Sequence, residues 1–155
     1  MVAAMLGPTM PFHRIDYTRH EPEAYRALLG ASQQVHDGTL GSALTELVFL
    51  RVSQLNGCAY CIDMHATALR KAGTEPRKLD TLAAWRDSRF FDARERAALD
   101  WAEALTTLPA GAPPQAIYDA LTAQFDPAGI SALTMAVAVI NAWNRLGVGL
   151  QPTLP

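Results

Sequence analysis

Residues 46–65 constrain this chain more than any other stretch of its sequence. They contain both cysteines of the protein, one of its four histidines, and a glutamate set within an apolar helical pattern. Asn56-Gly57 indicates the end of one helix, so Cys58 and Cys61 open the next. We therefore expect two consecutive helices joined by a tight turn, with both sulfurs at the start of the second helix.

The spacing of the cysteines and the histidine predicts thiol chemistry. Cys58 and Cys61 lie one helical turn apart, so they can close a disulfide with little backbone movement. The unpaired N–H groups and the dipole at a helix N-terminus favour a thiolate. His65 follows Cys61 by four residues and Cys58 by seven, which puts all three on one helix face. An imidazole in that place can take a thiol proton.

Glu46 supplies a carboxylate for the same group. It lies twelve residues before Cys58, near the middle of the preceding helix, among apolar neighbours that favour burial. If that helix folds back at the turn, the carboxylate can orient His65 or relay a proton. We predict that Cys61, beside His65, is the attacking sulfur and that Cys58 is the resolving one.

Two other interpretations of these residues stay open. The cysteines could be small buried hydrophobic residues without chemistry. Alternatively, Glu46, Cys58, Cys61 and His65 could supply four zinc ligands. Structural zinc usually draws on two separated ligand pairs, and the sequence has no second pair. We therefore predict no metal and no cofactor.

The pattern of Glu46, eleven residues, Cys58, two residues, Cys61, three residues and His65 resembles the AhpD-like alkylhydroperoxidases, which are grouped with the carboxymuconolactone decarboxylases. The segments around it, 51–57 and 62–65, and residues 141–145 near the C-terminus also resemble this family. There is one departure. The peroxidase members carry a second histidine directly before the second cysteine, and this chain has Tyr60 there.

The resemblance implies a function and its partners. It implies an alkylhydroperoxidase-type oxidoreductase in which the cysteine pair reduces an organic hydroperoxide and an external dithiol, of lipoyl or thioredoxin type, restores the thiols. It assigns the catalytic roles to Glu46, Cys58, Cys61 and His65. It also implies a homo-oligomer, a trimer or a multiple of trimers. A lactone decarboxylase remains an alternative, although such members generally lack the cysteine pair, and so does a non-enzymatic thiol redox sensor.

Composition excludes some other classes of function. The 155 residues carry a net charge of −2 with no basic cluster, so we expect no nucleic-acid partner. Two cysteines in a chain this long do not make a disulfide framework, which favours a redox pair in the cytoplasm. The N-terminus lacks the pattern of a signal peptide. The apolar run 128–144 contains polar residues and is expected to be a buried helix, so we predict no membrane association.

The periodicity predicts an all-α fold with one domain. We expect an N-terminal tail at 1–19, a helical bundle of six to seven helices at 20–150, and a C-terminal tail at 151–155. Within this bundle His36 is interpreted as structural, because it falls in the last turn of its helix. Arg51 lies five residues from Glu46, a poor offset for an intrahelical pair, so its partner is expected elsewhere. The helices are expected at about 22–36, 40–55, 58–72, 75–85, 93–107, 114–125 and 127–146.

Two further predictions concern the ends of these helices. Asp92 and Glu95 form the pattern of a capping box. The glycines at 147 and 149 are expected to end the last helix. The polar residues at its end, Asn141, Asn144 and Arg145, are expected to tie helices together through buried hydrogen bonds.

Overall fold

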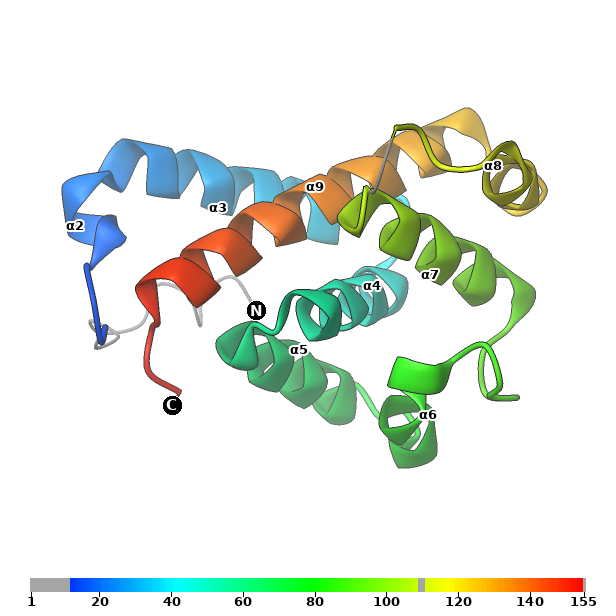
Figure 1. The fold of residues 1–155 in the computed structure, drawn as a ribbon, viewed down its shortest axis with the longest axis horizontal. Helices are drawn as coiled ribbons and strands as arrows, with labels where there is room; N and C mark the ends of the chain where they lie inside the picture. The colour runs from blue at the N-terminus through cyan, green and yellow to red at the C-terminus, as the bar shows by residue number, and fades with distance from the viewer. Residues whose placement is uncertain (1–11, 109–110, 155) are drawn as a thin grey trace.

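The computed structural model describes residues 12–108 and 111–154. Within these ranges the chain is helical, with eight α-helices, one short 3-10 helix, and a single β-bridge between Phe12 and Pro152. Figure 1 shows their arrangement. In chain order the elements are α2 (Tyr17–His20), α3 (Pro22–His36), α4 (Ser42–Asn56), α5 (Ala59–Lys71), α6 (Pro76–Asp80), η1 (Leu82–Ala84), α7 (Ala93–Thr106), α8 (Gln115–Thr122) and α9 (Pro127–Leu150).

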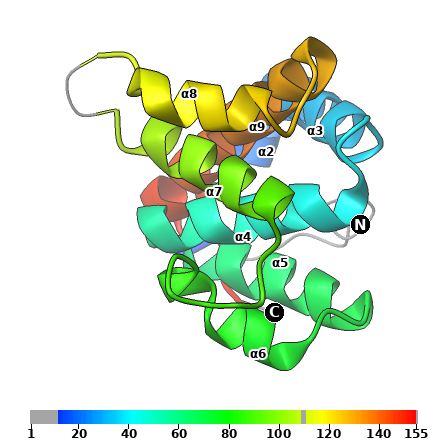
Figure 2. The ribbon, with the colours of Figure 1, turned by 90° about the vertical axis from the view of Figure 1, so that its right-hand side faces the viewer.

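Helix α4 lies at the centre of the molecule. It packs against α3, α5, α7, α9 and η1, and Figure 2 shows α5 and α7 on opposite sides of it. Most of its residues are buried, as their apolar pattern predicted. Each fully buried leucine or valine contributes about 1.5–3 kcal/mol to folding. A polar side chain on this helix therefore needs a partner from another helix.

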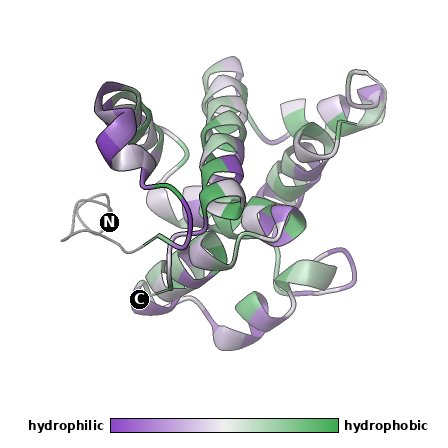
Figure 3. Cartoon of the chain, turned by 60° about the vertical axis from the view of Figure 1, so that its left-hand side comes forward, coloured by the Kyte–Doolittle hydropathy of each residue, from purple (hydrophilic) through white to green (hydrophobic). Residues whose placement is uncertain are grey.

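The surrounding helices turn their apolar faces towards this centre. Figure 3 shows hydrophobic colour along the inward surfaces of the helices and more hydrophilic colour at outer turns and connections. Helix α9 is long and apolar enough to cross a membrane by length and composition alone. It packs against α3, α4, α5, α7 and α8, which is the expected place of a core helix.

Two helices begin as the sequence predicts. At α7 the side chain of Asp92 accepts the N–H of Glu95, and the side chain of Glu95 accepts the N–H of Asp92, which completes the capping box. At α9 the Asp126 side chain accepts the N–H of Gly129 at 2.7 Å, and Pro127 occupies the first turn.

Three predicted boundaries are wrong. Residues 17–20, expected in the tail, form the short helix α2, whose N-cap Asp16 accepts the N–H of Thr18. The helix expected at 75–85 divides into α6 and η1. Helix α9 continues through both glycines and ends only at Gln151, which is left-handed with φ 53°. The part of the predicted tail at 1–11 lies outside the described residues.

The described segments before α2 and after α9 meet. His13 N–H donates to the Gln151 carbonyl at 3.0 Å, and the Arg14 guanidinium donates to the Gly149 carbonyl at 2.8 Å. Together with the bridge between Phe12 and Pro152, these bonds hold the segment before α2 against the segment after α9.

Arg51 has its partner on α7, as expected from its poor offset to Glu46. Its Nε donates to Glu103 at 2.6 Å. The same carboxylate accepts the indole N–H of Trp85 at 2.8 Å and an N–H of Arg86 at 2.5 Å. These donors, with burial opposing them, leave the pKa of Glu103 below its ordinary value.

Candidate active site

The turn between α4 and α5 positions the cysteines. Gly57 takes a left-handed conformation, with φ 68° and ψ 30°, that a residue with a Cβ adopts less readily. Cys58 then becomes the N-cap of α5, and its sulfur accepts the N–H of Cys61 at 3.4 Å. Both cysteines thus stand at the positive end of the helix dipole, where the spacing predicted them.

Cys58 and Cys61 are joined in a disulfide, the oxidised state of the pair. Their Cα atoms are 5.4 Å apart, within the ordinary range for such a bond. The two residues are 2% and 3% exposed, respectively. A reactant therefore reaches a sulfur only through an internal space.

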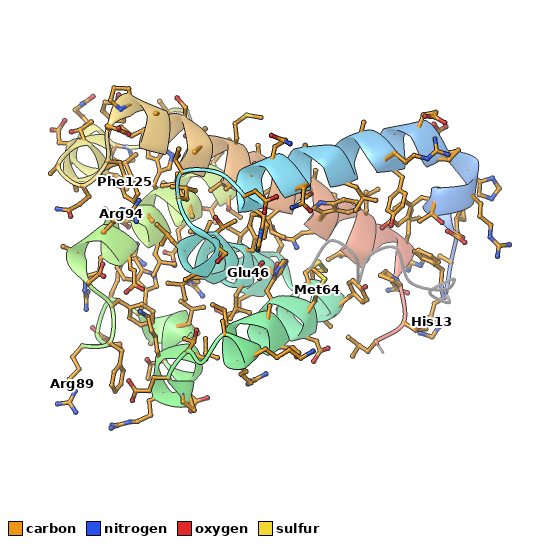
Figure 4. The ribbon with its side chains drawn as sticks, turned by 180° about the vertical axis from the view of Figure 1, so that it is seen from behind. His13, Glu46, Met64, Arg89, Arg94 and Phe125 are labelled. Carbon is orange, nitrogen blue, oxygen red and sulfur yellow. A yellow bond between two sulfur atoms is a disulfide. The ribbon has the colours of Figure 1, made fainter. Side chains whose placement is uncertain are left out.

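The side chain of Glu46 lies in the interior of the molecule (Figure 4). It contacts His65 on the neighbouring helix α5. Its Oε2 lies 2.8 Å from Nδ1 of His65, and both residues are buried. Phe49 packs edge-on against the imidazole, with ring centroids 5.1 Å apart, and restricts its rotation. The structure thus brings together the glutamate and histidine that the sequence analysis paired.

The hydrogen bond to Glu46 decides which nitrogen of His65 can act as a base. An ionised carboxylate only accepts hydrogen bonds, so the proton of a neutral ring belongs on Nδ1. Nε2 then carries the lone pair. It is buried and has no hydrogen-bond partner among the described residues. This nitrogen is therefore chemically available to a proton from a neighbouring group.

His36 joins the site, which the sequence analysis did not predict. It does lie in the last turn of α3, but its Nε2 is 3.5 Å from Oε1 of Glu46. The two oxygens of Glu46 therefore face two different imidazoles. No sequence pattern connected His36 to the motif, because its helix reaches α4 only through tertiary packing.

A cavity of about 40 Å³ lies in front of this group. Cys61, His65 and His36 are on its wall, whereas Cys58 is not. The remaining wall is mainly apolar and aromatic and comes from α2, α3, α4, α5, α9 and the C-terminal segment: Tyr17, Ser32, Phe49, Tyr60, Met64, Ile140, Trp143, Gly147 and Pro152.

The phenols on this wall are held neutral by their surroundings. Burial is the main cause that raises the pKa of Tyr60, with Tyr25 and Asp63 adding to it. Burial also raises the pKa of Tyr17, assisted by the neighbouring phenols and Asp16. Tyr60 occupies the position directly before Cys61, so a neutral hydroxyl stands where the peroxidase members of the resembling family carry a histidine.

The backbone of α9 at Gly147 packs against the sulfur of Cys58, a contact that the sequence did not predict. A Cβ at this position would lie 2.6 Å from Sγ of Cys58, closer than such atoms approach. Glycine therefore allows the backbone of α9 to pass directly over Cys58. This contact explains why a glycine stands at this position within α9.

Two of the three polar residues at the end of α9, Asn141 and Asn144, tie helices together as predicted. Asn56 donates to the side-chain oxygens of Asn141 and Asn144 at 3.0 and 2.9 Å. Asn144 in turn donates to the hydroxyl of Ser53 at 3.0 Å. These bonds fix α9 over the turn that carries the cysteines. The prediction is wrong for Arg145, which is exposed and donates to Asn141 within the same helix.

The alternative zinc site gains no support from the arrangement of side chains. Across 12–108 and 111–154, no cluster of three or more His, Cys, Asp or Glu residues is arranged to hold a metal ion. The sulfurs are bonded to each other.

Comparisons with known proteins identify the family. The model of the carboxymuconolactone decarboxylase family matches residues 22–104 of this chain. The uncharacterized protein YdfG of Bacillus subtilis is 31% identical over 137 residues, which cover 88% of this chain and 93% of that protein.

Solved structures agree in fold. ATU0492 from Agrobacterium tumefaciens, a protein of unknown function provisionally assigned to antioxidant defence as AhpD, is 34% identical, with a TM-score of 0.88. The match covers 92% of this chain and 97% of that one. The debrominase Bmp8 is 19% identical, with a TM-score of 0.79 over 89% of this chain and 74% of its own, and so shares the fold. This chain is therefore an AhpD-like member of the carboxymuconolactone decarboxylase family.

Proposed function

We propose that this protein is a thiol-dependent peroxidase that reduces organic hydroperoxides through Cys58 and Cys61. The observation that carries the proposal is the bond between Glu46 and His65, which leaves a free imidazole nitrogen on the residue that shares a cavity with Cys61. A nucleophile, a base and an acid that orients the base are the parts of an activated nucleophile.

The first step consumes the peroxide. In the reduced protein, Nε2 of His65 takes the proton of the Cys61 thiol, and the imidazolium stabilises the thiolate. The thiolate attacks the distal peroxide oxygen: an S–O bond forms and the O–O bond breaks. His65 returns the proton to the alkoxide that leaves, which gives an alcohol and a sulfenic acid on Cys61.

The second step closes the disulfide. The sulfur of Cys58 attacks that of Cys61: the S–S bond forms, the S–O bond breaks, and hydroxide leaves with the Cys58 proton as water. An external dithiol then reduces the pair by thiol–disulfide exchange and is itself oxidised to a disulfide. The short Cα separation supports this step because little movement is needed.

The environments of the two sulfurs support Cys61 as the attacking one. Cys61 lines the cavity with His65 and Cys58 does not, and a Cβ at Gly147 would lie closer to Sγ of Cys58, at 2.6 Å, than to Sγ of Cys61, at 3.6 Å. The apolar wall, which includes Phe49, Ile140 and Trp143, favours an organic over a strongly polar peroxide.

The burial of both sulfurs bears on the reductant. A dithiol carried on a long, narrow arm, as in a lipoyl group, can enter a cavity that a dithiol held on a flat protein surface cannot. We therefore favour a lipoyl-type donor over a thioredoxin-type one. A cytoplasmic location suits the cycle, because thiols there are kept reduced.

We also propose that several copies assemble, as the family resemblance implies for a trimer or a multiple of trimers. Leu108, Met135 and Val148 are 58%, 56% and 45% exposed. Leu108 follows the C-cap of α7, and Met135 and Val148 lie on α9. Their burial between copies would remove apolar surface from water.

Thiol counting tests the proposal. The chain has two cysteines, so every thiol that is titrated belongs to the pair. We expect one equivalent of an organic hydroperoxide to remove two thiols per reduced chain. Cys61→Ser should not react, and Cys58→Ser should stop turnover while leaving a sulfenic acid that a dimedone-type reagent traps. If both variants turn over peroxide as fast as the parent protein, the proposal is wrong.

The same preparation distinguishes the alternatives. A redox sensor would form the disulfide with peroxide, turn over slowly with lipoyl-type and thioredoxin-type dithiols, and bind a partner in one redox state. A lactone decarboxylase would release carbon dioxide from a muconolactone substrate and keep this activity in both serine variants.

A further inference from the structure

We propose that His36 is a second histidine of the active site, which shares the charge of Glu46 with His65 and exchanges one proton with solvent in each turnover. This inference rests on the proposed peroxidase cycle, although its decisive measurement does not require activity. His36 acts through Glu46 and is therefore a positioning residue.

Four side chains form a row from solvent to the interior. Asp37 Oδ1 lies 3.2 Å from Nδ1 of His36, Nε2 of His36 lies 3.5 Å from Glu46 Oε1, and Glu46 Oε2 lies 2.8 Å from Nδ1 of His65. Their side chains are 60%, 21%, 6% and 2% exposed, in that order. His36 is therefore the member of the row that contacts both water and the buried carboxylate.

Glu46 needs a charge partner in both halves of the cycle. It is buried, and its Oε1 has no hydrogen-bond partner among the described residues. A buried carboxylate without a compensating charge is costly. When His65 holds the thiol proton, the imidazolium compensates Glu46. When His65 is neutral, His36 is the nearest described group that can supply the charge.

The other groups around the cavity do not change charge near neutral pH. Asp37 stays ionised, because hydrogen bonds from Gln33 and then His36 hold the pKa of that carboxyl below its ordinary value. The phenols of Tyr17 and Tyr60 stay neutral, because burial raises the pKa of each. Histidine is the side chain that ordinarily changes charge between pH 5 and 8. We therefore assign the change of charge during the cycle to His36 and His65.

His36 releases one proton to solvent and takes one back in each turnover. As the Cys61 thiol gives its proton to His65, protonated His36 releases one proton to solvent. As His65 gives its proton to the leaving alkoxide, His36 takes one proton from solvent. Over a turnover no net proton is gained or lost at the site, and Glu46 always has one imidazolium beside it.

Two substitutions of His36, with opposite expected effects on the protonation of His65, test the proposal. The measurement is the pH at which His65 takes up its proton, followed by the imidazole NMR signals of the oxidised protein, in which no thiol titrates. His36→Gln removes the competing charge, so His65 should bind its proton at least about threefold more tightly, a rise of about half a pH unit. His36→Arg supplies a permanent charge, so His65 should bind its proton more weakly by a similar factor.

His20→Gln is the matched control, because His20 is exposed on α2 and outside the cavity. It should leave the His65 titration unchanged. Peroxide turnover with a lipoyl-type donor should fall about tenfold in His36→Gln with little change in KM. If the His36 variants leave the His65 titration where it is, or move it in the same direction, the proposal is overturned. If the titration moves as expected but the parent protein does not turn over peroxide, only the proposed function fails.

Discussion

Two carboxylates, Glu46 on α4 and Glu103 on α7, differ in their hydrogen-bond partners. Glu103 accepts hydrogen bonds from Arg51, Trp85 and Arg86, so permanent charges and an indole donor occupy its oxygens. Glu46 is more deeply buried, yet it has one hydrogen bond, to His65, and a second oxygen that faces His36 without a bond. Two of the three partners of Glu103 are arginines, which stay charged at every physiological pH, whereas the two side chains that face Glu46 are imidazoles.

The difference is between a carboxylate held by arginines and one that faces only histidines among the described side chains. Arginine holds Glu103 ionised and ties α4, η1 and α7 together. A site built this way is stable but cannot move a proton. In the proposed cycle the two histidines beside Glu46 exchange a charge, so the surroundings of this carboxylate change state during the reaction. Burial alone does not distinguish these two residues, and the chemistry of their partners does.

The largest expected effect is on activity, from Glu46→Gln. The amide has nearly the shape of the carboxylate but cannot balance an imidazolium or fix the Nδ1 proton. We expect peroxide turnover to fall by about 100-fold, which corresponds to about 2.7 kcal/mol. The free energy of unfolding should change little, because a buried charge is removed together with its bond. Steady-state kinetics and urea unfolding of the same preparation measure both quantities.

The matched variant Glu103→Gln should show the opposite pattern. It leaves Arg51 partly buried without an anion, and we expect the free energy of unfolding to fall by about 2 kcal/mol with turnover nearly unchanged. Asp100→Asn is the control, because Asp100 meets only Arg86 near the surface and should cost at most about 0.5 kcal/mol. A loss of activity in Glu103→Gln as large as that in Glu46→Gln would contradict the distinction.

The smallest expected effect is on the pH dependence of stability. The folded-state pKa of Glu103 lies below its ordinary value of 4.5. Its contribution is therefore fully present above that value and is lost as the pH falls through the folded-state pKa. The difference in unfolding free energy between the parent protein and Glu103→Gln should shrink below about pH 4.5, by roughly 1 kcal/mol or less. A difference that stays constant between pH 7 and 3 would show that the carboxylate is not held by its charge.

The sequence predicted the centre of the site because its spacing is local. Cys58, Cys61 and His65 share one helix, and helical geometry alone puts them on one face. Glu46 required one further assumption, that the chain reverses at Gly57, and the left-handed conformation there confirms it. The roles of these four residues in catalysis remain predictions.

The parts that the sequence analysis missed depend on packing between distant helices. His36 comes from α3, and its distance to Glu46 depends on the angle at which α3 crosses α4. Gly147 was interpreted as a helix end because glycine often has that role. Its actual contact, with a sulfur almost ninety residues earlier in the chain, leaves no local pattern in the sequence. Such contacts appear only when the helices are placed in space.

The contact between the segments before α2 and after α9 has a practical consequence for any assay of this protein. Pro152 forms part of the cavity wall and also pairs with Phe12, next to the backbone bond between His13 and Gln151. We expect an affinity tag or fusion partner joined close behind Pro152 to obstruct substrate entry. Weak activity measured with a C-terminal tag would then report the tag, so kinetic measurements should be made after its cleavage.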